Sequence, residues 1–252
     1  MWLAVVLVLV AMPGCASGVP PSRLDTFFGP VAMAESQQAS LPPRPIHAGL
    51  LVLADTSAAD AAPAPPEGAL MRLAEQLQQQ ITEMTLISID KILPASALQH
   101  NRDPSQFRDL KRQYGLDYLV LVVASSTEQE YPVTLFLGWV THAQPGWRRD
   151  NWSLLEVALV DLNTGVPVVR AEGRGWATLD WPTAPGINQW YPVIWLRPQD
   201  PVRHVWPPSY AAAPNTLRVV SMNDAAERMI HNLQDAWIEK RDTELSADRR
   251  AG

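Results

Sequence analysis

The chain has 252 residues, of which 47% are hydrophobic, and its formal net charge is −6. This length predicts one domain of about 200 residues with additional terminal segments. The acidic balance argues against a nucleic-acid-binding protein, because such a protein needs a basic face. Cys15 is the only cysteine, so an intramolecular disulfide is excluded.

The first fifteen residues join a short aliphatic run to this cysteine. Residues 2–12 are apolar, and Pro13, Gly14 and Cys15 follow. The run is too short to cross a hydrocarbon core of about 30 Å, but it fits the apolar region of a secretory signal. The stretch resembles the lipobox of bacterial lipoproteins, with Met12 where leucine is usual and no Lys or Arg before the apolar run.

The lipobox resemblance implies that residues 1–14 are a lipoprotein signal peptide. Cys15 is then lipidated with acyl chains such as palmitate and becomes the mature N-terminus. Ala16 follows it, which implies release to the outer membrane. Two alternatives remain open, an ordinary signal peptide cut nearby and an internal hydrophobic segment.

Residues 15–45 are rich in proline, serine and glutamine, which predicts a lipidated N-terminus followed by a flexible tether. A coil of this length spans roughly 30 Å. Phe27 and Phe28 interrupt this composition, and we expect them to dock on the chain's own domain in preference to a partner.

Residues 46–246 are predicted to form a single domain that begins with alternating strands and helices. Strands are expected at 46–54, 86–93 and 117–124, which are short aliphatic runs. Helices are expected at 70–84, from its apolar periodicity, and at 103–114, where Gly115 is placed to end the helix.

Further strands are expected at 131–141, 152–162 and 166–176, with Asn163-Thr164-Gly165 as the turn of a hairpin. A helix capped at residues 221–224 is expected to follow, with a frayed end at 239–252. The predicted class is α/β (α+β): a mixed β-sheet with an N-terminal βαβαβ order, a β-hairpin and a C-terminal helix.

Residues 177–217 form an insert rich in tryptophan and proline, without clear periodicity. Large aromatic residues are enriched in binding hot spots and at membrane–water boundaries. The rings are expected to pack over the sheet as a lid, to bind a protein partner, or to contact a glycan or membrane surface. The candidate partner-binding residues are Trp181, Trp190, Tyr191, Trp195 and Trp206.

Several segments together resemble the rhombotarget lipoprotein family of Gram-negative bacteria. They are residues 15–18 (Cys-Ala-Ser-Gly), 23–30 (Arg-Leu-Asp-Thr-Phe-Phe-Gly-Pro), 48–53, 92–95 (Ile-Leu-Pro-Ala), 114–122, 154–162 and 168–173. The order also resembles curli-secretion and penicillin-binding-protein-activator lipoproteins. The resemblance implies an envelope lipoprotein linked to surface-protein sorting or envelope assembly, and it contains no catalytic motif.

The sequence has no Gly-x-Ser-x-Gly elbow, no His-Glu-x-x-His motif and no Walker loop. We therefore expect no catalytic residue, metal or cofactor, and a non-enzymatic accessory protein. It is expected on the periplasmic face of the outer membrane, held by its lipid, with an envelope protein as partner. The alternative is an envelope hydrolase under the insert, which would bring Asp55, Glu128 or a histidine into one cleft.

Overall fold

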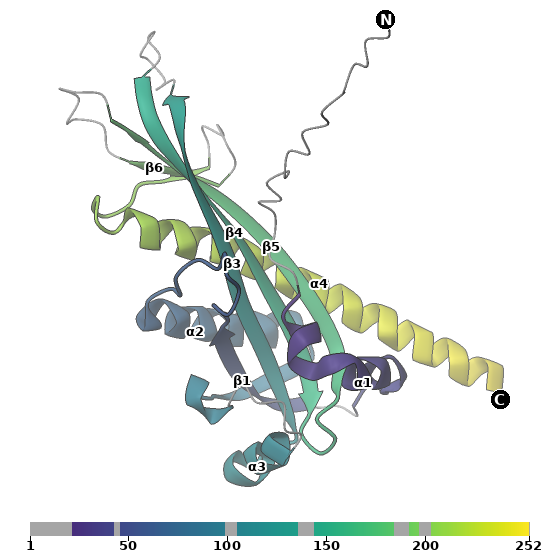
Figure 1. Cartoon of the computed structure of the whole chain (residues 1–252). Helices are drawn as coiled ribbons and strands as arrows, with labels where there is room; N and C mark the ends of the chain where they lie inside the picture. The colour runs from purple at the N-terminus through teal and green to yellow at the C-terminus, as the bar shows by residue number, and fades with distance from the viewer. Residues whose placement is uncertain are drawn as a thin grey trace, which may run out of the picture.

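The computed structural model describes residues 22–42, 46–98, 105–135, 144–183, 192–196 and 203–251 (Figure 1). The helices are α1 (Leu24–Gln38), α2 (Glu67–Met84), the short 3-10 helix η1 (Ala95–Ala97), α3 (Ser105–Tyr114) and α4 (Ala213–Ala251). The strands are β1 (Ile46–Ala54), β2 (Ile87–Ile92), β3 (Tyr118–Leu135), β4 (Gln144–Asp161), β5 (Pro167–Pro182), β6 (Val193–Trp195) and β7 (His204–Val205).

One mixed sheet has the strand order β2-β1-β3-β4-β5-β6-β7. Strand β1 runs parallel to β2 and β3, and the remaining neighbours are antiparallel. The predicted α/β class is confirmed, with its strand–helix alternation, hairpin and C-terminal helix. Gly165 has φ 74° in the predicted hairpin turn, and Gly115 has φ 67° where α3 ends.

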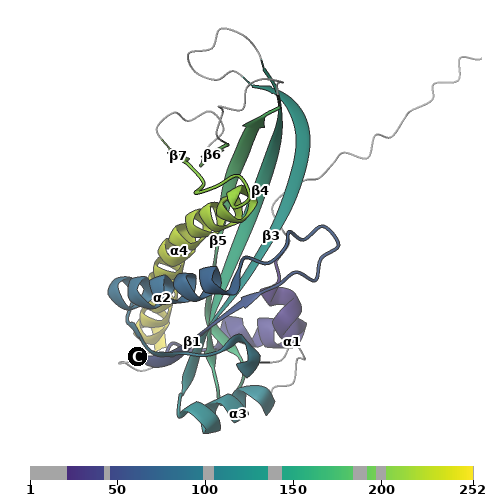
Figure 2. The same cartoon turned by 90° about the vertical axis from the view of Figure 1, so that its left-hand side faces the viewer.

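Helices cover the sheet on both sides (Figure 2). On one side, here called the α4 face, α2 and α4 enclose a core that includes Leu50, Leu77 and Met229. On the other, the α1 face, α1 and α3 pack over Leu51 and its neighbours. Successive residues of a strand point to opposite faces, so β1 is apolar on both.

Helix α4 lies unusually close to β5 because two glycines face it. A Cβ atom on Gly173 would lie 2.1 Å from the carbonyl oxygen of Ala225, and one on Gly175 would lie 2.1 Å from that of Ser221. Gly173 and Gly175 therefore give β5 one face small enough for the helix backbone to approach it.

Several predicted element boundaries from β3 to α4 are wrong. Strand β3 continues from residue 118 to 135 where two strands were expected, and β4 begins at residue 144, inside the expected loop 142–151. The expected insert 177–217 is shorter, because β5 reaches Pro182 and α4 begins at Ala213. Ser221 does not cap α4, because the helix already begins at Ala213. The Ser221 side chain is buried and hydrogen-bonded to Ser153. The end of α4 is helical as far as Ala251.

The prediction of a flexible tether over residues 15–45 is wrong for residues 24–38, which form α1 against the sheet. Phe28 stacks on Phe107 of α3, with ring centroids 6.1 Å apart, which confirms that this island docks on its own domain. The predicted signal peptide 1–14 and Cys15 lie outside the described residues. Within the part that is described, no helix has both the length and the apolar character to cross a membrane.

Candidate functional site

The strands β3, β4 and β5 continue beyond the helices into a long twisted extension that carries β6 (Figure 1). We call it the distal sheet: residues 126–135, 144–153 and 175–182, with β6 and β7. The sheet register places aromatic side chains on both of its faces, because alternate residues point in opposite directions.

An aromatic groove lies on the α4 face of the distal sheet, beside the start of α4. It is a half-open cavity of about 140 Å³ lined by Arg149, Leu179, Trp181, Pro192, Tyr210, Ala213 and Pro214. Trp147 pairs with Trp181 across β4 and β5, and the two therefore share this face. Tyr210, which lines the groove, is 54% exposed, and Trp147 is 39% exposed.

Arg149 joins this groove to the charged groups of the neighbouring strand. Its guanidinium carbon lies 5.5 Å from the Trp181 ring centroid, within cation–π range. Its Nε donates to Glu130 at 2.8 Å, and Glu130 lies on β3. The cation is therefore held between a carboxylate and a ring, in a fixed position at the groove.

An aromatic strip crosses the α1 face of the distal sheet. It consists of Trp152, Trp176, Trp195, His204 and Trp206. Trp152 and Trp176 stack with centroids 6.2 Å apart, and His204 lies 5.7 Å from both Trp195 and Trp206. Trp195 pairs with Thr178, two residues beyond Trp176, so the rings follow one another from β4 to β7.

Polar side chains on the same face of the distal sheet bind one another. The buried carboxylate of Asp150 accepts hydrogen bonds from the Tyr131 hydroxyl at 2.7 Å and the Thr178 hydroxyl at 2.5 Å. Arg148 donates twice to Asp180, at 2.7 and 2.8 Å, and this pairing raises the pKa of Arg148. Burial, followed by the bond to Asp150, raises the pKa of Tyr131 to about 12.

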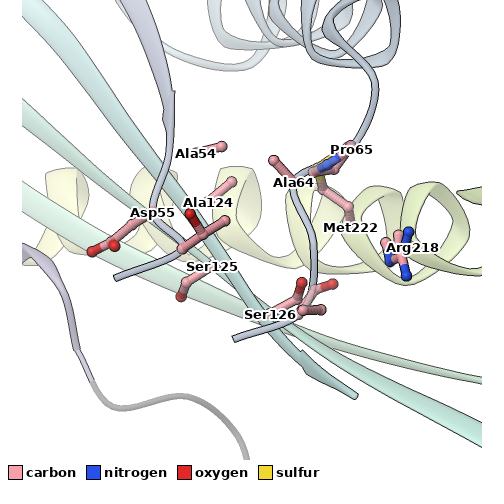
Figure 3. A pocket seen from close by; sticks show the side chains of 12 residues that line it. Ala54, Asp55, Ala64, Pro65, Ala124, Ser125, Ser126, Arg218 and Met222 are labelled. Atoms are coloured by element: carbon pink, nitrogen blue, oxygen red, sulfur yellow. The ribbon is translucent and has the colours of Figure 1, made fainter. Parts of the chain in front are cut away.

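A polar pocket lies where β1 ends, between the following loop and α4 (Figure 3). Asp55, Ser126, Ser153 and Arg218 contribute its polar lining, and its volume of about 10 Å³ holds roughly one water molecule. Arg218 donates to both oxygens of Glu128, at 2.6 and 2.9 Å. Asp55 is the carboxylate that lines this pocket, whereas Glu128 is held by the guanidinium of Arg218.

Of the described groups that the hydrolase alternative would bring into one cleft, only Asp55 lines the polar pocket. Glu128 and Glu130 are two residues apart on β3 and share a face, but each is bound by a different arginine. His47 pairs with Asp90 at 3.2 Å between β1 and β2, away from the polar pocket. Among the described residues no group of three His, Cys, Asp or Glu side chains could hold a metal ion.

The structure divides the predicted partner-binding residues between two faces. Trp181 lines the groove, whereas Trp195 and Trp206 belong to the strip; Trp190 and Tyr191 lie outside the described residues. Our sequence reasoning missed Trp147, Trp152, Trp176 and Tyr210. The sequence could have indicated the first three. Trp152 and Trp176 are equally distant from Thr164 of the predicted turn, and so are Trp147 and Trp181, so a hairpin places the members of each pair opposite one another.

No protein-family model matches the chain, and no curated protein is similar to it. Among solved structures, the chain is similar to a neuraminyllactose-binding hemagglutinin homolog from Helicobacter pylori, at 10% identity and a TM-score of 0.38, over 78% of this chain and 88% of that one. It is also similar to a PelC dodecamer from Paraburkholderia phytofirmans, at 11% identity and a TM-score of 0.26, over 74% of this chain and 91% of that one. Likenesses at these TM-scores carry no argument about function.

Proposed function

We propose that the chain is a lipid-anchored, non-catalytic protein of the bacterial envelope that binds an envelope protein through the aromatic groove. The observation that carries this proposal is the composition of the groove: Arg149, Trp181 and Tyr210 line one half-open cavity, and Trp147 pairs with Trp181 beside it. Tryptophan, tyrosine and arginine are the residue types that contribute most binding energy at protein interfaces.

The size of the groove favours a protein over a small molecule as its occupant. Its volume of about 140 Å³ is well below the range of roughly 300–1,000 Å³ usual for small-molecule sites. It is sufficient for one inserted side chain of a partner. The supporting residues are rigid, because Arg149 is bound to Glu130 and Leu179 is buried, so little conformational entropy would be lost on binding.

The anchoring part of the proposal rests on the sequence around Cys15. Lipidation there would contribute about 0.8 kcal/mol per buried CH₂ group, and more than one acyl chain makes attachment stable. The resemblance to rhombotarget lipoproteins supports a location on the periplasmic face of the outer membrane and a role beside surface-protein sorting or envelope assembly.

Crosslinking in intact cells followed by mass spectrometry tests partner binding. We expect a discrete envelope protein to be crosslinked to the wild-type chain and lost from the Trp181→Ala/Tyr210→Ala variant. Ile238→Ala is the control, since Ile238 is an apolar residue of α4 outside the groove that is 50% exposed, close to the value for Tyr210. Unchanged partners in the double variant would remove the proposed role of the groove.

A further inference from the structure

We propose that the aromatic strip docks on the phospholipid–water interface of the membrane that holds the Cys15 anchor. This proposal rests on the proposed lipid anchoring, and it adds the face that the domain turns toward the bilayer. The argument combines the point where the chain reaches the sheet, the position of the strip, and the chemistry of its rings.

The described chain begins on the α1 face. The Ser22 hydroxyl donates to the carboxylate of Glu156 on β4 at 2.5 Å, and the backbone N–H of Arg23 donates to the same carboxylate at 2.6 Å. Seven residue steps separate Cys15 from Ser22, which span at most about 25 Å whatever their conformation. A lipid on Cys15 therefore keeps Ser22, on the α1 face, within about this distance of the bilayer surface.

The strip lies on that same face, close to the attachment point. Trp152 and Glu156 are four residues apart on β4, so their side chains point the same way, and the separation along the strand is about 13 Å. Trp176 stacks on Trp152 from β5, and the remaining rings continue toward the free edge of the sheet. The short connection thus places the rings within reach of the membrane surface.

The exposed rings have the chemistry of a membrane interface. Tryptophan is enriched at the headgroup level, where an apolar ring and a polar N–H are both satisfied. Trp176 is 38% exposed and Trp206 is 58% exposed. Arg174 and Glu172, exposed charges close to Trp176 on β5, neutralise one another, because Arg174 donates to Glu172 at 2.8 Å. Docking should therefore depend little on anionic lipid or on salt.

This orientation leaves the α4 face turned away from the bilayer. The aromatic groove lies on that opposite face and stays open to a protein partner while the strip is docked. The two aromatic regions of the distal sheet thus have separate roles, one toward lipid and one toward protein.

The test uses the chain from Cys15 onward, coupled through this single cysteine to maleimide-bearing phosphatidylcholine vesicles. Lipids brominated near the headgroup end of their acyl chains quench interfacial tryptophan. We expect the loss of tryptophan emission caused by these lipids to be about twofold smaller in Trp176→Phe/Trp206→Phe than in the wild-type protein. Trp147→Phe, a similarly exposed ring on the α4 face, should leave it unchanged.

Equal quenching in the wild-type protein and in the double variant would overturn the proposal, as would a larger loss in Trp147→Phe. Strip emission that responds to an added protein or saccharide and not to vesicles would also overturn it. Phenylalanine keeps a ring at each site, and near-UV circular dichroism confirms that the variants are folded. Because the coupling is chemical, the result does not depend on natural lipidation. An unlipidated Cys15 in cells would contradict the proposed anchoring. Equal quenching in the double variant and the wild-type protein would contradict membrane docking alone.

Discussion

The carboxylate of Glu156 accepts a hydrogen bond from the backbone N–H of Arg23 at 2.6 Å, so the central strand β4 caps the first helix of the chain. The same buried carboxylate also binds the N–H of Leu24 and the hydroxyl of Ser22. Helix starts have unsatisfied N–H groups, and Arg23, the N-cap residue of α1, makes no side-chain capping bond. This contact converts the first part of the predicted tether into a docked helix.

Loss of this cap should release α1. Glu156→Ala leaves the N–H groups of Arg23 and Leu24 without their acceptor and should cost about 1–3 kcal/mol of local stability. Hydrogen exchange of the amides in residues 24–38 should then accelerate while the exchange of β4 changes little. Glu172→Ala, at an exposed carboxylate of the same face, is the control. Equal protection of α1 in both variants would contradict the capping role.

Gly173 should not tolerate a side chain. A Cβ there would lie 2.3 Å from the backbone nitrogen of Met229 as well as close to Ala225, so α4 must move away from β5. We expect Gly173→Ala to lower the free energy of unfolding by about 3 kcal/mol. Gly68→Ala in α2, whose Cβ would meet nothing nearer than 3.7 Å, should be neutral or slightly stabilising. Urea denaturation measures both, and similar losses would contradict the close packing.

Removing one charge of the Arg218–Glu128 pair should destabilise the fold more than removing both charges. Both side chains are largely buried, so Arg218→Met leaves an uncompensated carboxylate and should cost about 3–5 kcal/mol. Removing both charges with Arg218→Met/Glu128→Gln should recover much of this loss. Arg112→Met breaks an exposed pair with Asp109 and should change stability by less than about 1 kcal/mol. A double variant no more stable than Arg218→Met would contradict the assigned cause.

Tyr131 should make stability sensitive to alkaline pH. Its pKa in the folded chain is raised from 10.0 to about 12, so the folded state holds this proton more tightly than the unfolded state does. The resulting stabilisation is complete below pH 10 and is lost as the pH rises toward 12. Tyr131→Phe should therefore be less stable than the wild-type chain at pH 8, and the difference should shrink by pH 11.5. A constant difference in urea denaturation at the two pH values would contradict this linkage.

The parts of the fold predictable from sequence were those specified locally. The aliphatic run at 46–54, the periodic helix at 67–84 and the Gly165 turn each contain their own signal. Helix α1 does not, because its cap comes from a residue 133 positions away. The distal part of β4 lay outside the predicted strands, but the structure extends the strand there, where Arg148 and Arg149 are each bound by a carboxylate on a neighbouring strand.

The candidate site was predictable only in its residue types. The tryptophan-rich insert pointed to Trp181, Trp195 and Trp206, and all three lie in aromatic regions of the distal sheet. Their division between two faces depends on strand register, which places Trp181 opposite Trp147 and Trp195 opposite Thr178. Tyr210 reaches the groove from the segment before α4, a placement that no local pattern encodes.

Metabolic labelling with a fatty-acid probe tests the central claim, the lipid anchor at Cys15, most directly. We predict that the wild-type chain, expressed in a Gram-negative host, incorporates the probe and fractionates with the outer membrane. Cys15→Ser should be unlabelled and should no longer fractionate with the outer membrane. An unlabelled wild-type chain, or a Cys15→Ser variant that still carries the probe, would contradict the claim.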